Sequence, residues 1–384
     1  MPTFPIYLDN NATTRTDPRV VDAMLPYFSE IYGNAASQSH AFGWAAAEAV
    51  ATARKQVASL IGADPREIVW TSGATESNNL AIKGVLEAYP APGSHFITAV
   101  TEHQAVLDSA RHLERSGRCV TYLGVDKNGQ ISLSELVSAF RPETVLVSLM
   151  MGNNEIGTLQ PVAEIGALCR ERGVLFHSDA TQCIGKMPVN LETLPIDLMS
   201  LTAHKMHGPK GVGALYARRR APRVRLSAQM DGGGHERGMR SGTLNVSGIV
   251  GFGKAAQIGQ EELVEEQAKL IFLRDRLING LLGSIEGTHL NGHPTERLPN
   301  NANIAFEGLE ADALIAGLPE VALSTGSACS SEAIGPSHVL SAIGLGKLAN
   351  SSLRFGVSRY TTEEEVDWVV GRLGEIVSRL RRLK

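Results

Sequence analysis

The sequence predicts an α/β protein built around a mainly parallel sheet, and three observations indicate that fold class. Short apolar runs rich in β-branched residues recur between residues 68 and 201, each bounded by Gly, Asp, Asn or Ser. Most of these runs are followed by a stretch with helical spacing, as in chains whose strands pair in parallel. Past about residue 255 the regular alternation of apolar runs and helical stretches ends, which predicts a second, smaller α+β domain.

The first unit opens with a predicted helix over residues 44–61, where the apolar positions fall on one face. The predicted strands are residues 68–70, 96–100, 120–123, 145–150, 174–176 and 198–201, with 213–217 as a seventh candidate. In the second unit, residues 261–285 predict one long helix. Strands of a smaller sheet are expected at residues 301–306, 321–324 and 353–357. A capping box at Thr362 and Glu365 opens a last helix, from residue 363 to about 380.

The composition excludes several classes of protein. A chain of 384 residues with 43% hydrophobic residues is long enough for two or three domains with real cores. A net charge of −4 gives no sign of nucleic-acid or anionic-membrane binding. No stretch of about 18 apolar residues and no N-terminal targeting pattern occur, so we expect a cytoplasmic protein without a membrane span.

Standard ligand-binding motifs are missing from the sequence. It has neither of the glycine-rich nucleotide fingerprints, and His235-Glu236 lacks the second histidine of a zinc protease motif. His177 and Asp179 share one face of a predicted strand, but no third ligand lies nearby in sequence. We therefore expect no metal site.

A denser pattern follows the strands. Polar clusters come at the ends of five of the predicted strands, at residues 71–78, 101–103, 153–155, 177–182 and 200–205. Each cluster alone has an ordinary structural explanation, such as a capped turn or a solvent-exposed lysine. Together they are unlikely to be independent, because ligands in open α/β sheets bind at the edge formed by the carboxyl ends of the strands.

These clusters contain the groups that pyridoxal phosphate needs. The turn at residues 71–78 leads small and hydroxyl residues into a helix N-terminus, a setting that suits a phosphate. Asp179 can pair with a pyridinium nitrogen, and Lys205 can form a Schiff base with an aldehyde. The pattern therefore predicts a pyridoxal-phosphate site.

The motifs also carry a resemblance that runs over nearly the whole chain. They are TSGATESNN from Thr71, NNEIG from Asn153, DATQ from Asp179, HK-x-x-GPKG from His204, GGGHERGMRSGT from Gly232 and STGSACSS from Ser324. In this order they resemble the cysteine desulfurases of the fold-type-I pyridoxal-phosphate enzymes. The resemblance implies a large domain with a mainly parallel seven-stranded sheet (residues 15–255) and a small α+β domain (residues 1–14 and 256–384).

The resemblance also implies a role for each matching residue. Lys205 would bind the cofactor covalently and shuttle a proton, Asp179 would hold the ring nitrogen protonated, and His103 would stack on the ring and assist proton transfer. Gln182 would reach the phenolic oxygen of the ring, and Asn154 would contact cofactor or substrate. The phosphate would be bound by Ala74, Thr75, Thr202 and His204, together with Thr243 from the second subunit of a homodimer. Arg354 would pair with the substrate carboxylate, with Asn34 as a weaker candidate beside it.

Cys329 differs from the other three cysteines of the chain. It lies in residues 324–331, a run of small residues that predicts a mobile loop with an accessible sulfur. The resemblance makes Cys329 the nucleophile. Cys119, Cys169 and Cys183 are expected to be reduced packing residues, because no CxxC pair or disulfide pattern is present.

The resemblance implies removal of sulfur from L-cysteine, release of L-alanine and a persulfide on Cys329. The loop type is similar to that of the housekeeping and nitrogen-fixation branch, which passes sulfur to acceptors such as an iron–sulfur scaffold protein, or to other thiolation. Relatives that dock a scaffold often extend beyond the last helix, whereas this chain stops at Lys384, so the acceptor stays open. An aminotransferase, a selenocysteine lyase and a non-enzymatic scaffold subunit are the alternatives. The first has no need of Cys329, the second would prefer selenocysteine, and the third would show no turnover.

Overall fold

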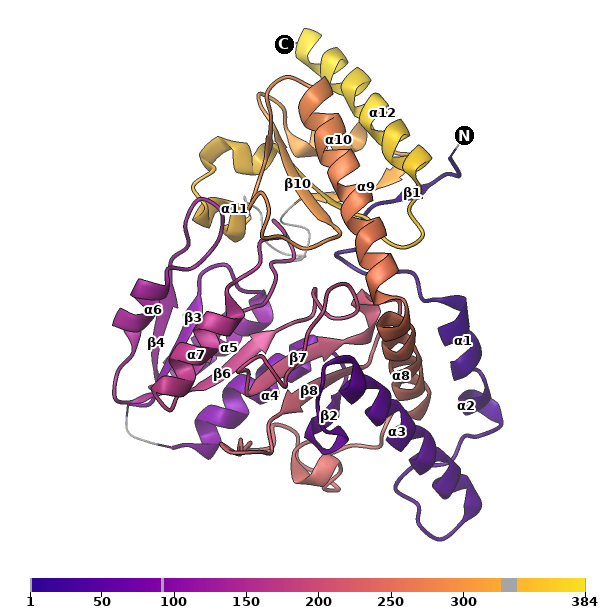
Figure 1. Cartoon of the computed structure of the whole chain (residues 1–384), viewed down its shortest axis with the longest axis vertical. Coiled ribbons are helices and arrows are strands. Elements are labelled where there is room, and N and C mark those ends of the chain that lie inside the picture. Colours follow the sequence, from indigo (N-terminus) through magenta and orange to yellow (C-terminus); the bar gives the residue numbers. More distant parts are fainter. Residues whose placement is uncertain (1, 91–92, 326–336, 384) are drawn as a thin grey trace.

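A seven-stranded sheet forms the centre of the larger, lower part of the molecule (Figure 1). The computed structural model describes residues 2–90, 93–325 and 337–383. The sheet has the order β2-β8-β7-β6-β5-β3-β4, and β8 alone runs antiparallel to its neighbours. Its strands are β2 (Ile68–Thr71), β3 (His95–Ala99), β4 (Cys119–Leu123), β5 (Thr144–Ser148), β6 (Leu175–Asp179), β7 (Leu198–Thr202) and β8 (Gly213–Ala217). The predicted fold class, a mainly parallel α/β sheet of seven strands, is confirmed.

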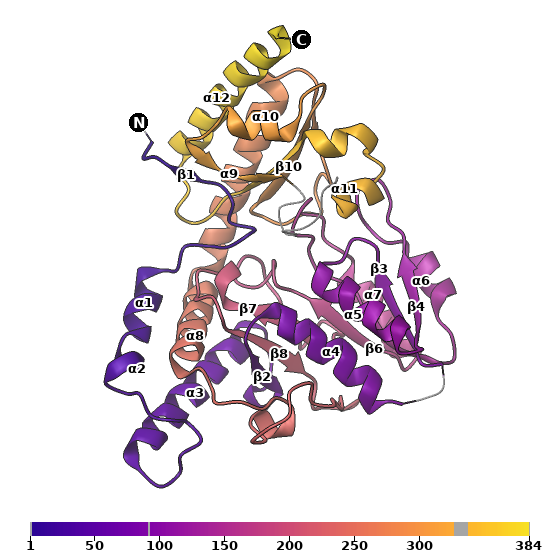
Figure 2. The same ribbon diagram turned by 180° about the vertical axis from the view of Figure 1, so that it is seen from behind.

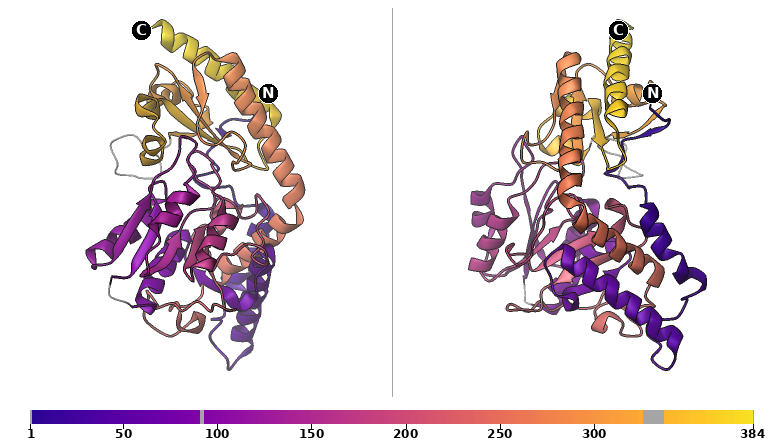
Figure 3. Two further views of the ribbon diagram at one scale, coloured as in Figure 1. Left: turned by 60° about the vertical axis from the view of Figure 1, so that its left-hand side comes forward. Right: turned by 45° about the vertical axis from the view of Figure 1, so that its right-hand side comes forward.

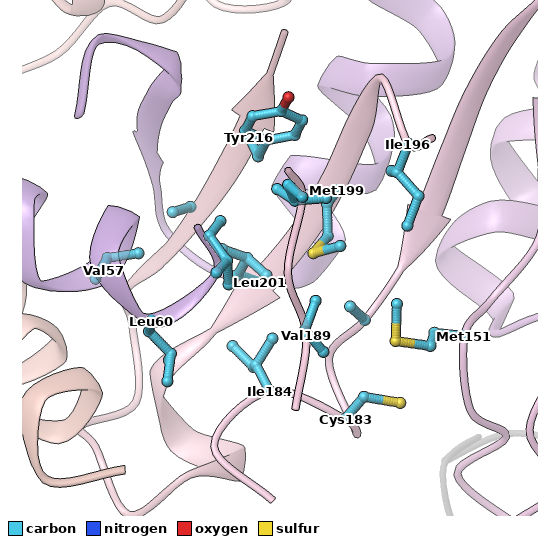
Figure 4. Packing of buried hydrophobic residues seen from close by; sticks show 14 of the residues in the cluster. Val57, Leu60, Met151, Cys183, Ile184, Val189, Ile196, Met199, Leu201 and Tyr216 are labelled. Atoms are coloured by element: carbon cyan, nitrogen blue, oxygen red, sulfur yellow. The ribbon is translucent and has the colours of Figure 1, made fainter. Parts of the chain in front are cut away.

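Helices cover both faces of this sheet (Figures 1 and 2). They are α1 (Pro18–Met24), α2 (Pro26–Ser29), α3 (Ala41–Leu60), α4 (Ala74–Ala88), α5 (Gln104–Arg115), α6 (Leu133–Ala139), α7 (Val162–Glu171) and α8 (Val246–Glu261). Alternate strand residues enter two cores: Ile68 and Trp70 pack with α3, α7 and α8, whereas Val69 packs with α4 and α5. Figure 4 shows part of the first core, around Met199 and Tyr216. Apolar residues on both faces explain why the strands appear as continuous apolar runs.

The smaller, upper part contains two short sheets and the remaining helices. A four-stranded antiparallel sheet has the order β12-β13-β10-β9, and β1 pairs with β11 in parallel. The strands are β1 (Ile6–Tyr7), β9 (Thr288–Leu290), β10 (Asn301–Phe306), β11 (Val321–Ala322), β12 (Ser324–Thr325) and β13 (Ser352–Gly356). The helices are α9 (Leu263–Ser284), α10 (Ala311–Ala316), α11 (His338–Ala342) and α12 (Glu363–Arg382). The capping box predicted at Thr362 and Glu365 is present at the start of α12.

Two details of the second unit differ from the sequence-based expectation. The single strand expected at residues 321–324 is divided, because β11 pairs with β1 whereas β12 pairs with β13 in the other sheet. Strands β1 and β9 were not expected, since they are only two and three residues long. Strand β1 also depends on a partner that is distant in sequence, since it pairs with β11.

Helices α8 and α9 connect the two parts, and the long α9 rises from one into the other (Figure 3). Ile249 and Phe252 of α8 belong to the core of the seven-stranded sheet, whereas Leu270 and Leu277 of α9 belong to the second core. The second core also takes residues from the N-terminal segment. The chain passes from the first core to the second at the junction of α8 and α9. The division into a large domain of residues 15–255 and a small domain of residues 1–14 and 256–384 stays a prediction.

The cysteine predictions are confirmed at two positions and wrong at one. Cys169 and Cys183 are fully buried in the first core, where burial raises the pKa of each thiol to about 12. Cys119 is exposed instead of packed, because it begins β4, the strand at the edge of the sheet. Cys329 and the predicted mobile loop lie outside the described residues. No helix among the described residues is long and apolar enough to cross a membrane.

Gly213 allows β8 to approach the turn between β2 and α4. A Cβ at this position would lie 2.6 Å from the Gly73 Cα and 2.7 Å from the Leu201 carbonyl oxygen, both backbone atoms. We predict that Gly213→Ala lowers the free energy of unfolding by about 1–3 kcal/mol, because the backbone must shift. Urea denaturation measures the effect.

The control is Gly371→Ala, at an exposed position inside α12 where a Cβ meets nothing within 4 Å. It should leave stability unchanged or raise it by up to about 1 kcal/mol, because alanine favours the helix. Equal stability of the two variants would contradict the close approach at Gly213.

Candidate active site

A cavity of about 550 Å³ lies at the carboxyl ends of the parallel strands. Nine of the predicted site residues line it: Ala74, Thr75, His103, Asn154, Asp179, Gln182, Thr202, His204 and Lys205. The loops that carry them follow β2, β3, β5, β6 and β7 in the sheet. The prediction that the five polar clusters converge on one edge is therefore confirmed.

The N-terminus of α4 faces this cavity and has the features of an anion site. Gly73 occupies the N-cap position, and no side chain caps the first N–H groups of the helix. Ser72, Gly73, Ala74 and Thr75 all line the cavity. Uncapped N–H groups and the positive end of the helix dipole favour a phosphate at this place.

Asp179 provides a buried carboxylate at the end of β6. Its side chain is 6% exposed. Oδ2 accepts a hydrogen bond from Asn78 Nδ2 at 2.7 Å, and Oδ1 accepts one from the Thr181 backbone N–H at 3.0 Å. These two donors hold the carboxylate in a fixed orientation inside the cavity wall.

Lys205 reaches the cavity from the short 3₁₀ turn Ala203–Lys205 after β7. Its Nζ donates to two backbone carbonyl oxygens of the N-terminal segment, Asn11 at 2.6 Å and Ala12 at 2.5 Å. The same segment is tied to the turn by the Thr14 N–H, which donates to the His204 carbonyl oxygen at 3.0 Å. The amine is therefore held by the backbone of the N-terminal segment, which is itself bonded to the turn that carries Lys205.

His103 is a neutral histidine with a defined tautomer. It is the N-cap of α5, and its Nδ1 accepts from the Ala105 N–H at 3.1 Å. Burial lowers the pKa of His103, and the positive charge of Lys205 adds to that effect against the opposing charge of Asp179. With Nδ1 as the acceptor, the neutral ring carries its proton on Nε2.

Gln182 and Arg354 connect the cavity to the N-terminal segment. Gln182 Nε2 donates to the Asn11 carbonyl oxygen at 3.0 Å. Arg354 is fully buried on β13, pairs with Asp9 at 2.8 Å and donates to the Asn154 carbonyl oxygen at 3.2 Å. Arg354 does not itself line the cavity, but it contacts a residue that does.

Two further predicted residues, Thr243 and Asn34, do not line this cavity. Thr243 and Asn34 are exposed, and the Asn34 side chain accepts from the Ala36 N–H at 2.9 Å. Cys329 lies outside the described residues. The roles expected for these three residues stay predictions. Among the described residues no group of histidine, cysteine and acidic side chains could hold a metal ion.

Sequence reasoning missed several residues that support the site. Asn78 orients Asp179, and Asn11 receives hydrogen bonds from both Lys205 and Gln182. Glu102 is buried, its carboxyl accepts from the Met150 N–H at 2.8 Å, and burial raises the pKa of that carboxyl well above the usual range. Asn78 is part of the TSGATESNN motif and could have been chosen there, whereas nothing in the sequence signals the carbonyl groups of residues 11 and 12.

Comparison with known proteins agrees with this geometry. The chain belongs to the aminotransferase class-V family, a family of pyridoxal-phosphate enzymes, whose model matches residues 6–369. Within that family it is similar to cysteine desulfurases. The cysteine desulfurase IscS of Anaeromyxobacter dehalogenans (strain 2CP-C) is 55% identical over 381 residues, which cover 99% of this chain and 94% of the relative.

Solved structures show the same likeness. A NifS-like protein superimposes with a TM-score of 0.90 at 39% identity, covering 97% of this chain and 99% of its own. SspA in complex with cysteine gives a TM-score of 0.82 at 36% identity, covering 93% and 100% of the two chains. The resemblance to the cysteine desulfurases found in the sequence is confirmed.

Burial keeps several histidines neutral, which makes stability depend on pH. The pKa of each of His95, His177, His204 and His207 is lowered to about 4, in every case mainly by burial. The unfolded chain takes up these protons near pH 6.5, whereas the native protein does not until about pH 4. The stabilisation is therefore complete above about pH 6.5 and is lost as the pH falls towards 4.

We predict that His177→Gln makes this loss less steep. His177 lies between the Ser148 and Ser200 hydroxyl groups, at 2.7 Å and 2.9 Å, and glutamine can still bond to one of them without titrating. The slope of unfolding free energy against pH should decrease by up to about 1.4 kcal/mol per pH unit. Urea denaturation at several pH values gives the slope, and parallel curves for the two proteins would contradict the assignment.

Proposed function

We propose that the protein is a pyridoxal-phosphate-dependent cysteine desulfurase that transfers the sulfur of L-cysteine to Cys329 and releases L-alanine. The observation that carries the proposal is the convergence of Lys205, Asp179 and the uncapped N-terminus of α4 on one cavity. An amine, a carboxylate and an anion site are the three groups that this cofactor requires. The 55% identity to a cysteine desulfurase supports the choice of substrate.

The residues present fit the cofactor. The N-terminus of α4, with Ala74 and Thr75, would hold the phosphate, together with Thr202 and His204. Glu76 also lines the cavity, but its charge is balanced by Arg240 at 2.7 Å. Asp179 would pair with the ring nitrogen, and Gln182 would donate to the phenolic oxygen of the ring.

When bound, pyridoxal phosphate supplies an electron-withdrawing ring that stabilises negative charge on the substrate. Lys205 would hold the cofactor through its Nζ and then, once the substrate amine has replaced it, take the α-proton. In the chain without cofactor, the carbonyl oxygens of Asn11 and Ala12 accept hydrogen bonds from this amine and hold it at the cavity.

His103 and Arg354 complete the arrangement around the substrate. The neutral His103 ring, with its proton on Nε2, can lie against a flat aromatic group and assist proton transfer. Arg354 has a planar fork that suits the substrate carboxylate. Asp9 holds this fork at 2.8 Å and thereby fixes its direction toward Asn154.

Cys329 would carry out the sulfur transfer. Its thiolate attacks the sulfur of the substrate, so that a sulfur–sulfur bond forms while the bond between that sulfur and the β-carbon breaks. The bonding electron pair stays with the substrate carbon, which takes up a proton and leaves as L-alanine. The sulfur is retained as a persulfide on Cys329.

We further propose that the enzyme works as a homodimer in which Thr243 completes the phosphate site of the partner. Two observations on the single chain support this proposal. Thr243 is exposed. Large apolar side chains are exposed between residues 21 and 44: Leu25 (56%), Phe28 (61%), Tyr32 (64%), Phe42 (51%) and Trp44 (59%). Several exposed apolar side chains within one short segment of the chain are typical of a subunit interface.

The persulfide would pass to an acceptor protein, such as a scaffold for iron–sulfur cluster assembly, or to another thiolation step. The similarity of residues 324–331 to the housekeeping and nitrogen-fixation branch supports this role. A reducing cytoplasm suits the proposal, because it keeps a nucleophilic thiol free.

Mass spectrometry of Cys329 tests the proposed function. After brief exposure of the purified protein to L-cysteine, we expect one added sulfur on the peptide that contains Cys329. Cys329→Ala should keep the absorption of the bound cofactor but form no persulfide and release alanine about a hundredfold more slowly or worse.

Cys119→Ala is the matched control, because Cys119 is an exposed thiol at the start of β4, whereas the cavity lies at the carboxyl ends of the strands. It should behave as the unmodified protein does. Alanine release at the normal rate by Cys329→Ala, or a persulfide on Cys119 in its place, would contradict the mechanism.

A further inference from the structure

Lys186 is a buried lysine just behind the cavity, and the proposed mechanism gives it no role. Only 3% of it is exposed. Its Nζ donates to two atoms of one residue, the Gln182 carbonyl oxygen at 3.2 Å and Gln182 Oε1 at 3.4 Å. Within residues 2–90, 93–325 and 337–383, no salt bridge includes Lys186. Glu266, which attracts it, is paired with Arg359.

A buried ammonium without a carboxylate partner is costly. Burial lowers the pKa of Lys186 to about 8, and the positive charge of Lys205 acts in the same direction. A methionine would fill the same space without that cost. Gln182 provides both hydrogen-bond acceptors of Lys186 Nζ, so the effect of the buried ammonium group falls on Gln182.

Lys186 determines which end of the Gln182 amide faces the cavity. An ammonium group can only donate hydrogen bonds, so the amide oxygen must face Lys186 and the NH₂ group must face away. Asn11 matches this orientation, because its Nδ2 donates to Oε1 at 3.3 Å and its carbonyl oxygen accepts from Nε2 at 3.0 Å. The flipped amide would place two donors against each other.

The second N–H of Gln182 remains for the cavity. Nε2 has two hydrogens, of which one goes to the Asn11 carbonyl oxygen, and Gln182 lines the cavity. A cation on the amide oxygen also draws electron density from the nitrogen, which strengthens the remaining N–H as a donor.

The backbone between Gln182 and Lys186 is held in place by the packing of the residues between them. Cys183 and Ile184, on the same turn, are buried in the first core (Figure 4). The turn therefore offers Lys186 and Gln182 little freedom to separate.

We propose that Lys186 is a positioning residue that holds the Gln182 amide as a hydrogen-bond donor toward the phenolic oxygen of the bound cofactor. The inference rests on the proposed function, since it assumes pyridoxal phosphate in the cavity. A double-mutant cycle tests it, using Lys186→Met and Gln182→Leu at about pH 7, where Lys186 is charged. The two readouts are the affinity of the apo-protein for pyridoxal phosphate and the ratio of the absorption bands of the bound cofactor.

Lys186→Met should weaken cofactor binding about tenfold and change the band ratio, because the ammonium group no longer holds and polarises the Gln182 amide that donates to the charged oxygen. In the Gln182→Leu background the same substitution should change neither readout. The matched control is Lys254→Met on α8, where a half-buried lysine donates to Gln257 Oε1 at 3.2 Å away from the cavity, and it should match the unmodified protein.

Equal effects of Lys186→Met in both backgrounds would overturn the inference, since the lysine would then act without Gln182. A loss of stability with unchanged affinity and bands would overturn it as well, because the role would be structural. If the unmodified protein binds no pyridoxal phosphate, the proposed function fails and this inference fails with it. Binding by the unmodified protein with no effect of Lys186→Met contradicts the inference alone.

Discussion

The hydrogen bonds from Lys205 Nζ to the carbonyl oxygens of Asn11 and Ala12 join the two parts of the molecule at the cavity. The N-terminal segment that supplies these oxygens begins in the second core, where Ile6 and Leu8 are fully buried. It therefore brings backbone acceptors from one part to the sheet edge of the other. The cavity depends on this N-terminal segment, because Lys205, Gln182 and the 3₁₀ turn after β7 all form hydrogen bonds to it.

The electrostatics around the cavity follow from burial. His103, His177 and His204 are kept neutral by desolvation, so that charge is concentrated on a few groups with defined partners. Asp179 has two hydrogen-bond donors, and Arg354 has a carboxylate partner. Charged groups that are held by fixed partners can place a strong field on a bound cofactor without reorganising.

The sequence predicted the fold class and nine cavity residues because both depend on local signals. Apolar runs define strands, and parallel strands bring their carboxyl ends to one edge. The place of β8 beside β2, the division of β11 from β12 and the exposure of Cys119 at the sheet edge depend on pairings between distant segments. The support given by Asn11 and Lys186 was also beyond sequence reasoning, since it consists of a backbone carbonyl and a buried cation that only the tertiary structure brings together.

The account rests on Lys205 as the residue that holds the cofactor, and chemical trapping tests this most directly. Pyridoxal phosphate is added to the purified protein, the complex is reduced with borohydride, and the labelled peptide is identified by mass spectrometry. Because the carbonyl oxygens of Asn11 and Ala12 hold Lys205 in the cavity, the account predicts that label on Lys205 alone. Stable labelling of Lys186 or Lys210 instead, or no labelled lysine in a protein that binds the cofactor, would contradict it.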